Sequence, residues 1–403
     1  MEELAALAES AGADVRAHVI QYRESAEAAT LLGSGKVAEL KQLCAFHEAH
    51  VAIFDAELTP TQLRNLEKQL EVRVIDRTQL ILDIFAARAR TREGQLQVEL
   101  AQLNYLLPRL AGRGSAMSRL GGGIGTRGPG ETQLETDRRK IARRIKIIEK
   151  NLETVRSGRT IQRRQRQGVP LATVAMAGYT NAGKSTLFNR LTGAQVVADA
   201  RLFATLDPTV RHAILPSRRK VLLSDTVGFI RRLPTTLVKA FRATLEEVVE
   251  AKLILHVVDA SSPEAPRQTE QVMQVLAEID AAATPQIFVL NKADRLPEKP
   301  DAAAIAARLL SFAEEKTPRR AVCVSAMSGE GVPELLAAID DALPLDPVAA
   351  ARFLLAVGDG APLNLLHECA QVTSVEYTER GCEVEAIAPE SVRRRLSEYL
   401  ISS

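Results

Sequence analysis

One stretch of the sequence has the residue types and spacing of a phosphate-binding loop. It reads GYTNAGKST, follows an apolar segment, and opens a helical pattern at Ser185–Leu191, so it fits GxxxxGK[ST] in the context that this motif requires. Glycines let the backbone curl so that its N–H groups point at phosphate oxygens, and the helix N-terminus adds partial positive charge. We therefore expect Lys184 to reach the β- and γ-phosphates and the Ser185 hydroxyl to bind Mg²⁺. The residues expected to line the nucleotide here are Gly178, Tyr179, Thr180, Asn181, Ala182, Gly183, Lys184, Ser185 and Thr186.

A second motif selects the base. Asn291, Lys292 and Asp294 follow an apolar segment that is typical of a buried strand. A carboxylate at Asp294 can accept two hydrogen bonds from the N1–H and N2–H₂ edge of guanine, whereas adenine would leave it desolvated and unpaired. Ser325 and Ala326, after the next strand, are expected to place a backbone N–H near the guanine O6. The sequence thus predicts GTP and GDP as the nucleotides.

A third segment predicts a switch that responds to the γ-phosphate. It contributes the nucleotide-contacting residues Asp225, Thr226, Val227 and Gly228. We expect the Asp225 carboxylate to lie by Mg²⁺ through water and the Gly228 N–H to meet the γ-phosphate. Thr205, with Thr209 as second choice, is expected to bind Mg²⁺ while GTP is present. Lys184, Thr205 and Gly228 are therefore the predicted catalytic residues.

The position that carries the water-orienting glutamine in Ras-like GTPases is Phe229. No side-chain atom of phenylalanine can hydrogen-bond water, so we expect Phe229 to turn away from the site and hydrolysis to be slow without a partner. The water would then be positioned by backbone, by a cation or by a partner. Arg231 and Arg232 are nearby cations, although solvated basic residues are the simpler interpretation.

The elements that must position these motifs form an α/β fold. Between 168 and 345, apolar strands alternate with helices, as in a mostly parallel sheet covered on both faces. The predicted strands are Leu171–Ala177, Val221–Ser224, Leu253–Val258, Gln286–Leu290 and Ala321–Val324. We expect four domains: a small α/β domain (1–90), a helical hairpin (91–167), the GTPase domain (168–345) and a small C-terminal α+β domain (346–403).

The flanking domains have simpler patterns. In the first, helices are expected at Glu2–Ser10, Gly33–Ala49 and Thr59–Leu70, and strands at Val15–Tyr22, Val51–Phe54 and Val72–Ile75. In the last, a hairpin is expected at Val372–Glu376 and Glu383–Ile387, and a helix at Pro389–Leu400. Four dispersed cysteines favour reduced thiols without disulfides, and no apolar run is long enough for a membrane span. We expect a cytoplasmic monomer, and the net charge of +2 does not by itself identify a partner.

The helical hairpin predicts contact with nucleic acid. Leucines from Leu96 to Leu110 and apolar residues from Ile141 to Val155 repeat at spacings of 4 and 3, which is typical of two helices packed side by side. The intervening loop, 113–130, is rich in glycine and has arginines but no acidic residue. From Arg138 to Arg166 there are 12 Lys or Arg and only 2 Glu. A basic helix face often serves only solvation, but with this loop it favours a phosphate backbone. The predicted RNA contacts are Arg113, Arg119, Arg127, Arg138, Arg139 and Lys140.

The order GYTNAGKSTLFN, LFATLDPT, DTVGFI, NKAD and SA resembles the Era/Obg-like branch of translation-factor-type GTPases. The upstream segments VIDRTQLILDIFAARARTREGQLQVELAQLNYLLPRL and GGGIGTRGPGETQLETDRRKI are similar to those of HflX-type GTPases. This resemblance implies a GTPase that binds the large ribosomal subunit and splits stalled or idle ribosomes under stress, with its glycine loop near the rRNA of the peptidyl transferase centre. Members usually carry a strand before the first helix, which is absent here. Asn181 matches the K⁺ ligand of potassium-stimulated relatives, which implies K⁺ dependence; a hydrogen bond within the loop is the simpler alternative.

Three other interpretations remain open at this point. An assembly GTPase would use the same site on immature large subunits. A slow nucleotide-sensing adaptor would act on a protein target. An ATP-dependent RNA remodeller would use Gly33–Lys36 as a second phosphate loop, but this stretch is short, and Lys36 is better explained as capping or solvating its helix.

Overall fold

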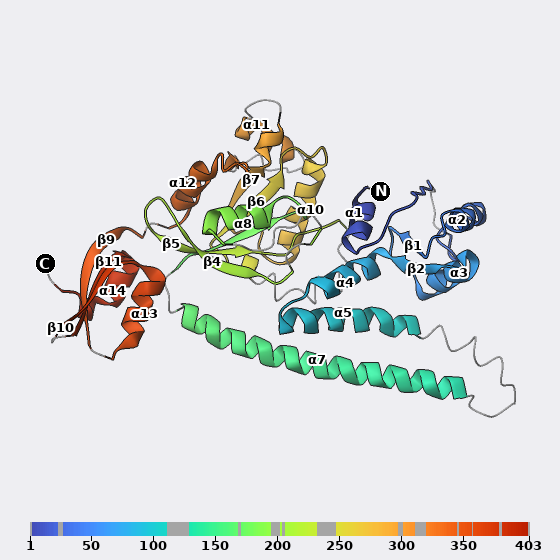
Figure 1. Ribbon diagram of the computed structural model, residues 1–403, viewed down its shortest axis with the longest axis horizontal. Coiled ribbons are helices and arrows are strands. Elements are labelled where there is room, and N and C mark those ends of the chain that lie inside the picture. Colours follow the sequence, from blue (N-terminus) through green and yellow to red (C-terminus); the bar gives the residue numbers. More distant parts are fainter. Residues whose placement is uncertain are drawn as a thin grey trace. The chain divides into compact units, whose positions relative to one another are not determined.

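The structure, a computed structural model, describes residues 2–22, 27–110, 129–167, 171–194, 202–203, 206–231, 247–296, 301–310, 320–344, 346–356, 358–378 and 381–401 (Figure 1). Contacts group these residues into two compact units. The first unit holds the described residues up to Arg156 together with Leu202, Phe203 and Leu206, and the second unit holds the other described residues.

The N-terminal part of the first unit is a small α/β layer. Its elements are α1 (Glu2–Ser10), α2 (Ser34–Phe46), β1 (Val51–Phe54), α3 (Pro60–Leu70), β2 (Arg73–Asp76) and α4 (Arg77–Arg88). The two strands pair in parallel, as their connection through α3 requires. Helix α3 begins at Pro60 because Thr59 and Gln62 cap it reciprocally through their side chains. Leu66 on α3 and Val74 on β2 are buried in the core that joins helices to strands.

The strand predicted over Val15–Tyr22 is wrong. Residues 13–22 have no regular structure, and Tyr22 is 91% exposed. Alternating apolar residues cannot form a strand without a neighbour for their N–H and C=O groups, and no described strand pairs with this segment.

The helical hairpin forms as predicted, from α5 (Arg92–Leu110) and α7 (Pro129–Gln167), which run antiparallel beside each other (Figure 1). Leu96 of α5 is buried with Ile148 and Leu152 of α7, so the predicted apolar seam is their interface. At the rim, Arg144 donates two hydrogen bonds, of 2.6 and 2.8 Å, to the Glu99 carboxylate. The predicted loop at 113–130 lies outside the described residues except for its last two, which begin α7.

The second unit is built on a six-stranded sheet of order β4-β5-β3-β6-β7-β8. Its strands are β3 (Thr173–Gly178), β4 (Thr209–Ile214), β5 (Lys220–Asp225), β6 (Leu253–Asp259), β7 (Gln286–Asn291) and β8 (Ala321–Cys323). All pair in parallel except β4, which is antiparallel to β5. The five predicted strands are confirmed within three residues at each end, and the edge strand β4 was not predicted. Its burial pattern alternates weakly, as at an exposed edge.

Helices cover both faces of this sheet. They are α8 (Lys184–Thr192), α10 (Ala265–Glu278), α11 (Ala302–Leu309) and α12 (Val332–Ala342), with the short helix η2 (Ala293–Arg295). On β7, Ile287 and Val289 join the core with α8 and α12, whereas Phe288 and Leu290 join the core with α10 and α11. Successive side chains of a strand point to opposite faces, so this division places one helix pair on each side. The predicted α/β fold class is confirmed.

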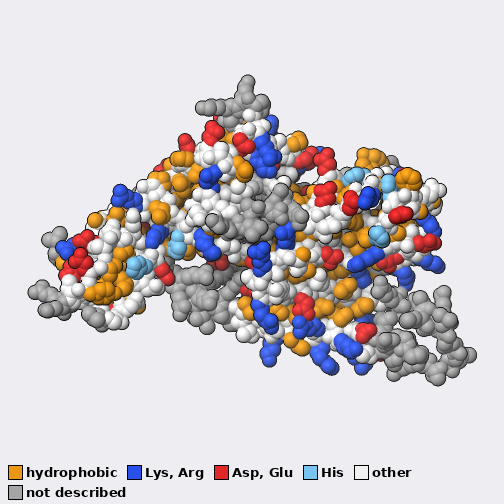
Figure 2. Space-filling model, viewed as in Figure 1, with side chains coloured by type: hydrophobic (Ala, Val, Ile, Leu, Met, Phe, Trp, Pro, Cys, Tyr) orange, Lys and Arg blue, Asp and Glu red, His pale blue; other side chains and the backbone are white. Residues whose placement is uncertain are grey.

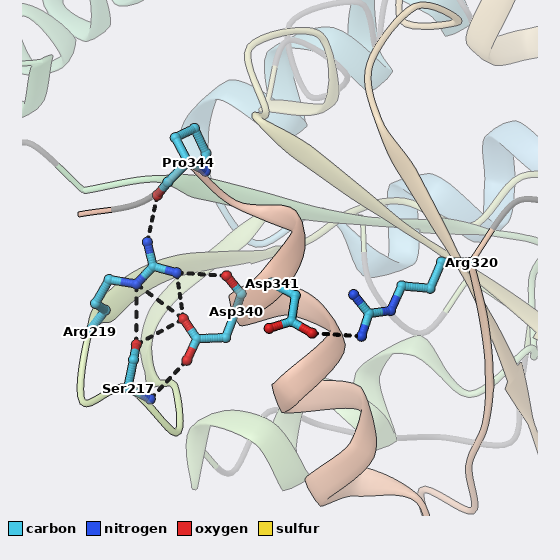
Figure 3. Close-up of polar contacts among 6 residues, drawn as sticks. All are labelled: Ser217, Arg219, Arg320, Asp340, Asp341 and Pro344. Carbon is cyan, nitrogen blue, oxygen red and sulfur yellow. Dashed lines mark hydrogen bonds and ion pairs between the residues drawn. The ribbon is translucent and has the colours of Figure 1, made fainter. Parts of the chain in front are cut away.

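A polar cluster ties the turn between β4 and β5 to the end of α12 (Figure 3). Asp340 accepts hydrogen bonds from the Ser217 N–H and hydroxyl, both at 2.8 Å, and from the Arg219 guanidinium. Arg219 also donates to the Pro344 carbonyl at 2.6 Å. Burial alone would raise the pKa of the Asp340 carboxyl, but the hydrogen bonds and charge of its partners outweigh this effect and lower it. The cluster therefore fixes the turn that joins the edge strand β4 to β5.

The C-terminal part is a three-stranded antiparallel sheet of order β10-β11-β9. Its elements are β9 (Val348–Leu355), α13 (Gly360–Cys369), β10 (Gln371–Thr378), β11 (Gly381–Pro389), α14 (Glu390–Arg395) and η3 (Ser397–Tyr399). The predicted hairpin is confirmed. The predicted final helix is shorter, because α14 ends at Arg395 and a separate single turn follows. Across the described ranges, no helix combines the length and apolarity that a bilayer span needs.

Candidate nucleotide-binding site

The loop from Gly178 to Lys184 joins the end of β3 to the start of α8. Two of its glycines are required by close packing. A Cβ at Gly178 would lie 2.2 Å from the Val257 carbonyl oxygen, and one at Gly183, which has a φ of +90°, would lie 2.2 Å from the Asn291 side chain. The loop therefore packs against β6 and β7 and leads directly into the first turn of α8. A loop that curls around the N-terminus of a helix is the arrangement of an anion-binding site.

Lys184 is buried inside this loop. Its ammonium donates to the carbonyls of Gly178 at 3.0 Å and Tyr179 at 2.9 Å. Burial lowers the pKa of Lys184 to about 8, although the Asp225 carboxylate acts in the opposite direction. An ammonium has three N–H donors, so the third is available to an anion. The negative charge of a phosphate in the loop would stabilise the ammonium form of Lys184, which burial disfavours.

Ser185, in the first turn of α8, meets Asp225, at the carboxyl end of β5. The Ser185 hydroxyl donates to the Asp225 carboxylate at 2.8 Å, and Asp225 is fully buried. The next residue, Thr226, donates its hydroxyl to the Met176 carbonyl at 2.6 Å, which fixes the end of β5 against β3. A hydroxyl and a carboxylate oxygen this close are the hard oxygen donors that Mg²⁺ prefers, so the residues fit the predicted metal. Thr186 lies half-buried in the same turn of α8.

Asn291 braces the base end of the site. Its amide N–H₂ donates to the Ala182 carbonyl at 2.8 Å, and its amide oxygen accepts from the Ala326 N–H at 3.0 Å. Asn291 thus joins the phosphate loop to the segment after β8. The Ala326 N–H that was predicted to meet guanine is engaged here, and Ser325 donates its own N–H to the Glu330 carbonyl at 2.9 Å.

The other two residues of the base motif differ in exposure. Lys292 donates to Asp259 at 2.7 Å, an ion pair that fixes the turn after β7. Asp294 lies in η2 and is exposed, with no hydrogen bond to its carboxylate among the described residues. Its carboxylate is therefore accessible to a planar base, as the predicted guanine contact requires.

The segment after β5 pairs with the phosphate loop. The Phe229 N–H donates to the Gly178 carbonyl at 3.1 Å, and the Thr180 N–H donates to the Phe229 carbonyl at 2.7 Å. The Phe229 side chain is 3% exposed, so it packs in the core as expected. Gly228 lies against Thr180 and Lys184, since a Cβ there would be 2.8 and 3.0 Å from their side chains. This pairing was not predicted, because backbone contacts have no signature in residue type.

Comparison with known proteins agrees with this geometry. Family models match as GTP-binding GTPase N-terminal over 1–86, GTP-binding GTPase middle region over 88–166, 50S ribosome-binding GTPase over 173–292 and elongation factor Tu GTP binding domain over 242–345. The GTPase HflX of Caldanaerobacter subterraneus subsp. tengcongensis is 46% identical over 402 residues, covering 100% of this chain and 90% of that protein. This chain belongs to the HflX family of GTPases.

Other relatives extend the comparison. The GTPase HflX of Magnetococcus marinus is 48% identical, and the match covers 94% of this chain and 85% of that protein. The GTPase HflX of Escherichia coli is 46% identical, and the match covers 85% of this chain and 79% of that protein. A GTP-binding protein of Sulfolobus solfataricus, solved with GDP, is 25% identical with a TM-score of 0.45, covering 85% of this chain and 94% of its own. As a member of the HflX family, the chain binds guanine nucleotides and hydrolyses GTP to GDP and phosphate.

The other predicted residues of this HflX-family chain differ in what the structure describes of them. Thr205, Arg232 and the loop residues Arg113, Arg119 and Arg127 fall outside the described residues. Thr209, the alternative to Thr205, lies on β4 opposite Asp225. Arg138, Arg139 and Lys140 are exposed on α7. Lys36 pairs with Glu39 at 2.8 Å, which agrees with its solvating interpretation and not with a second phosphate loop.

Two features were missed from the sequence. The Tyr179 hydroxyl accepts a hydrogen bond from the Arg231 N–H at 2.8 Å, so a phosphate-loop side chain holds the segment after Phe229. In the first unit, Phe203 packs edge-to-face on Phe85 with ring centroids 4.7 Å apart, and the Leu202 N–H donates to the Ser10 hydroxyl at 3.0 Å. The residues just before Thr205 are therefore anchored on α1 and α4, and only their apolar character was visible in the sequence.

Proposed function

We propose that this GTPase acts in the cytoplasm on the large ribosomal subunit, and that it splits or rescues stalled or idle ribosomes under stress. The observation that carries the proposal is the surface of α7. We define its basic face as the exposed residues Arg138, Arg139, Lys140, Arg143, Lys146 and Lys150. Figure 2 shows Lys and Arg side chains gathered along this helix.

The basic face is separate from the seam that holds α7. Ile148 and Leu152 pack against α5, so the basic residues are not needed for helix packing. Arg139 pairs with Glu135 at 2.6 Å, and Lys140 with Asp137 at 3.6 Å, but all four side chains are more than half exposed. Exposed ion pairs of this kind contribute little to stability, so their basic side chains can readily bind phosphates instead. The face thus suits the backbone of RNA, and the relative scarcity of aromatic residues argues against base stacking as the main mode.

The nucleotide site would supply the switch. Lys184 would hold the β- and γ-phosphates, Gly228 N–H would meet the γ-phosphate, and Asp294 would select guanine. Ser185, Asp225 through water and Thr205 would hold Mg²⁺, which when bound would neutralise charge on the phosphates. GTP would favour the conformation that binds the large subunit, and hydrolysis would release the protein.

Sucrose-gradient co-sedimentation with ribosomal subunits tests this proposal. We expect the chain to travel with large subunits in GTP or a non-hydrolysable analogue and to be lost from them in GDP. Intact 70S particles should separate into subunits with the analogue. Binding restricted to immature large subunits would favour an assembly GTPase, and capture of a protein that survives RNase treatment would favour a nucleotide-sensing adaptor; either result contradicts the proposal.

A further inference from the structure

A GTPase site without the glutamine needs another group to orient the attacking water. Phe229 cannot do so: its side chain is buried, and its N–H and carbonyl are both engaged by the phosphate loop, at Gly178 and Thr180. Phe229, the residue at the glutamine position, therefore cannot orient water through its side chain or its backbone.

Thr180 has the polar atom that Phe229 lacks. The residue is 6% exposed, and its hydroxyl has no hydrogen-bond partner among the described residues. A buried hydroxyl without a partner is destabilising and is uncommon in folded proteins. Neighbouring hydroxyls in the same site are satisfied: Ser185 donates to Asp225, and Thr226 donates to Met176. The Thr180 hydroxyl therefore differs from those of Ser185 and Thr226, which both have partners.

The Thr180 side chain lies beside Gly228, the residue that is expected to meet the γ-phosphate. A Cβ built on Gly228 would be 2.8 Å from the Thr180 methyl carbon and 3.0 Å from the Lys184 ammonium. Lys184 and the Gly228 N–H are the groups that hold the γ-phosphate in GTPases of this architecture. The Thr180 side chain and the Lys184 ammonium thus both lie next to Gly228, so we expect Thr180 to be near the γ-phosphate and the water that attacks it.

Two contacts fix the orientation of the loop at this point. The Thr180 N–H donates to the Phe229 carbonyl at 2.7 Å, and the preceding residue, Tyr179, accepts from the Arg231 N–H at 2.8 Å. Threonine is also β-branched, which restricts its side-chain rotamers. A catalytic hydrogen bond depends on such preorganisation, because a group already in place pays no reorganisation cost during the reaction.

We propose that the Thr180 hydroxyl accepts a hydrogen bond from the water that attacks the γ-phosphate of GTP. The water oxygen bonds to the γ-phosphorus, and the bond from that phosphorus to the β–γ bridging oxygen breaks, with its electron pair leaving on GDP. The water proton leaves with inorganic phosphate. Thr180 orients the nucleophile and is neither protonated nor consumed. This role rests on the proposed assignment of Gly178–Ser185 as the phosphate loop.

Thr180→Val tests the role, because valine keeps the shape and removes the hydroxyl. We expect single-turnover hydrolysis to fall about 10²-fold, as when one preorganised hydrogen bond to a transition state is lost. GDP affinity should stay within about threefold of the parental value. Fluoroaluminate with GDP mimics the phosphoryl group during transfer, so the affinity for this complex should fall by a factor similar to that of the hydrolysis rate. Thr180→Ser, which retains the hydroxyl, should restore most of the rate.

Thr269→Val is the matched control, since Thr269 is a buried threonine on α10 that donates to the Ala265 carbonyl at 2.8 Å. Its rate should be unchanged. The proposal is overturned if Thr180→Val hydrolyses GTP at the parental rate, or if GDP and fluoroaluminate complexes weaken equally, which would indicate a packing role. Failure of the phosphate-loop assignment is distinguishable, because Lys184→Met would then still bind GTP and GDP normally.

Discussion

The nucleotide site and the basic face of α7 hold their polar groups in opposite ways. In the site, Lys184, Asp225 and Asn291 are each at least 90% buried and engaged by partners from other elements. On the basic face of α7, Arg139 and Lys140 are exposed and pair with Glu135 and Asp137 of the same helix. A buried polar group has a single environment, whereas an exposed charge has many. The site should therefore depend on single residues, and the basic face on its total charge.

The largest effect that this comparison predicts is at the base. Asp294→Asn should lower GDP affinity about 10⁴-fold, because a site built to hydrogen-bond its ligand strongly disfavours an unpaired donor. The Kd for a fluorescent GDP analogue measures this effect. Asp280→Asn is the control, since Asp280 is exposed with a φ of +63°, which asparagine tolerates. A loss below tenfold would mean that Asp294 does not contact the base.

The phosphate end should respond almost as strongly. Lys184→Met should reduce kcat/KM for GTP by roughly 10²–10³-fold, since a preorganised cation at the transferred phosphoryl group is lost. The melting temperature should not fall, because methionine replaces a buried ammonium with apolar atoms of similar length. Lys252→Met, at an exposed lysine of the same unit, is the control. Unchanged turnover in Lys184→Met would contradict the expectation that the nucleotide site, unlike the basic face, depends on single residues.

A pH series sharpens the comparison without mutation. The pKa of Lys184 is lowered to about 8 by burial, and bound phosphate favours the ammonium form and raises it again. Nucleotide affinity should therefore be constant below about pH 8 and fall up to tenfold per pH unit above it. Stability of the free protein should change in the opposite direction, rising from about pH 8 toward the unfolded lysine value near 10.4. Lys184→Met should abolish both trends; their persistence would assign them to another group.

The two regions also differ in how well the sequence predicts them. The phosphate loop is readable because its chemistry is local: β3, the glycines and the first turn of α8 are consecutive in the chain. The links that complete the site are not local. Asn291 bracing Ala182 and Ala326, and Phe229 pairing with the loop, depend on which strands become neighbours. Residues 15–22 illustrate the same limit, since alternation predicted a strand for which the fold provides no partner.

The basic face should show the smallest effect per residue. Replacing Arg138, Arg139 and Lys140 together by glutamine should weaken binding to large subunits and reduce the slope of log K against log salt. The expected change in slope is roughly 0.7–0.9 for each phosphate contact removed, and each single change should matter only severalfold. Nucleotide affinity should be unaffected, because the buried site does not depend on these charges. Arg267→Gln, at an exposed arginine of α10 paired with Glu264, controls for general loss of positive charge. If one of the three single variants alone abolished binding, the face would contain a specific contact, and the contrast with the nucleotide site would fail.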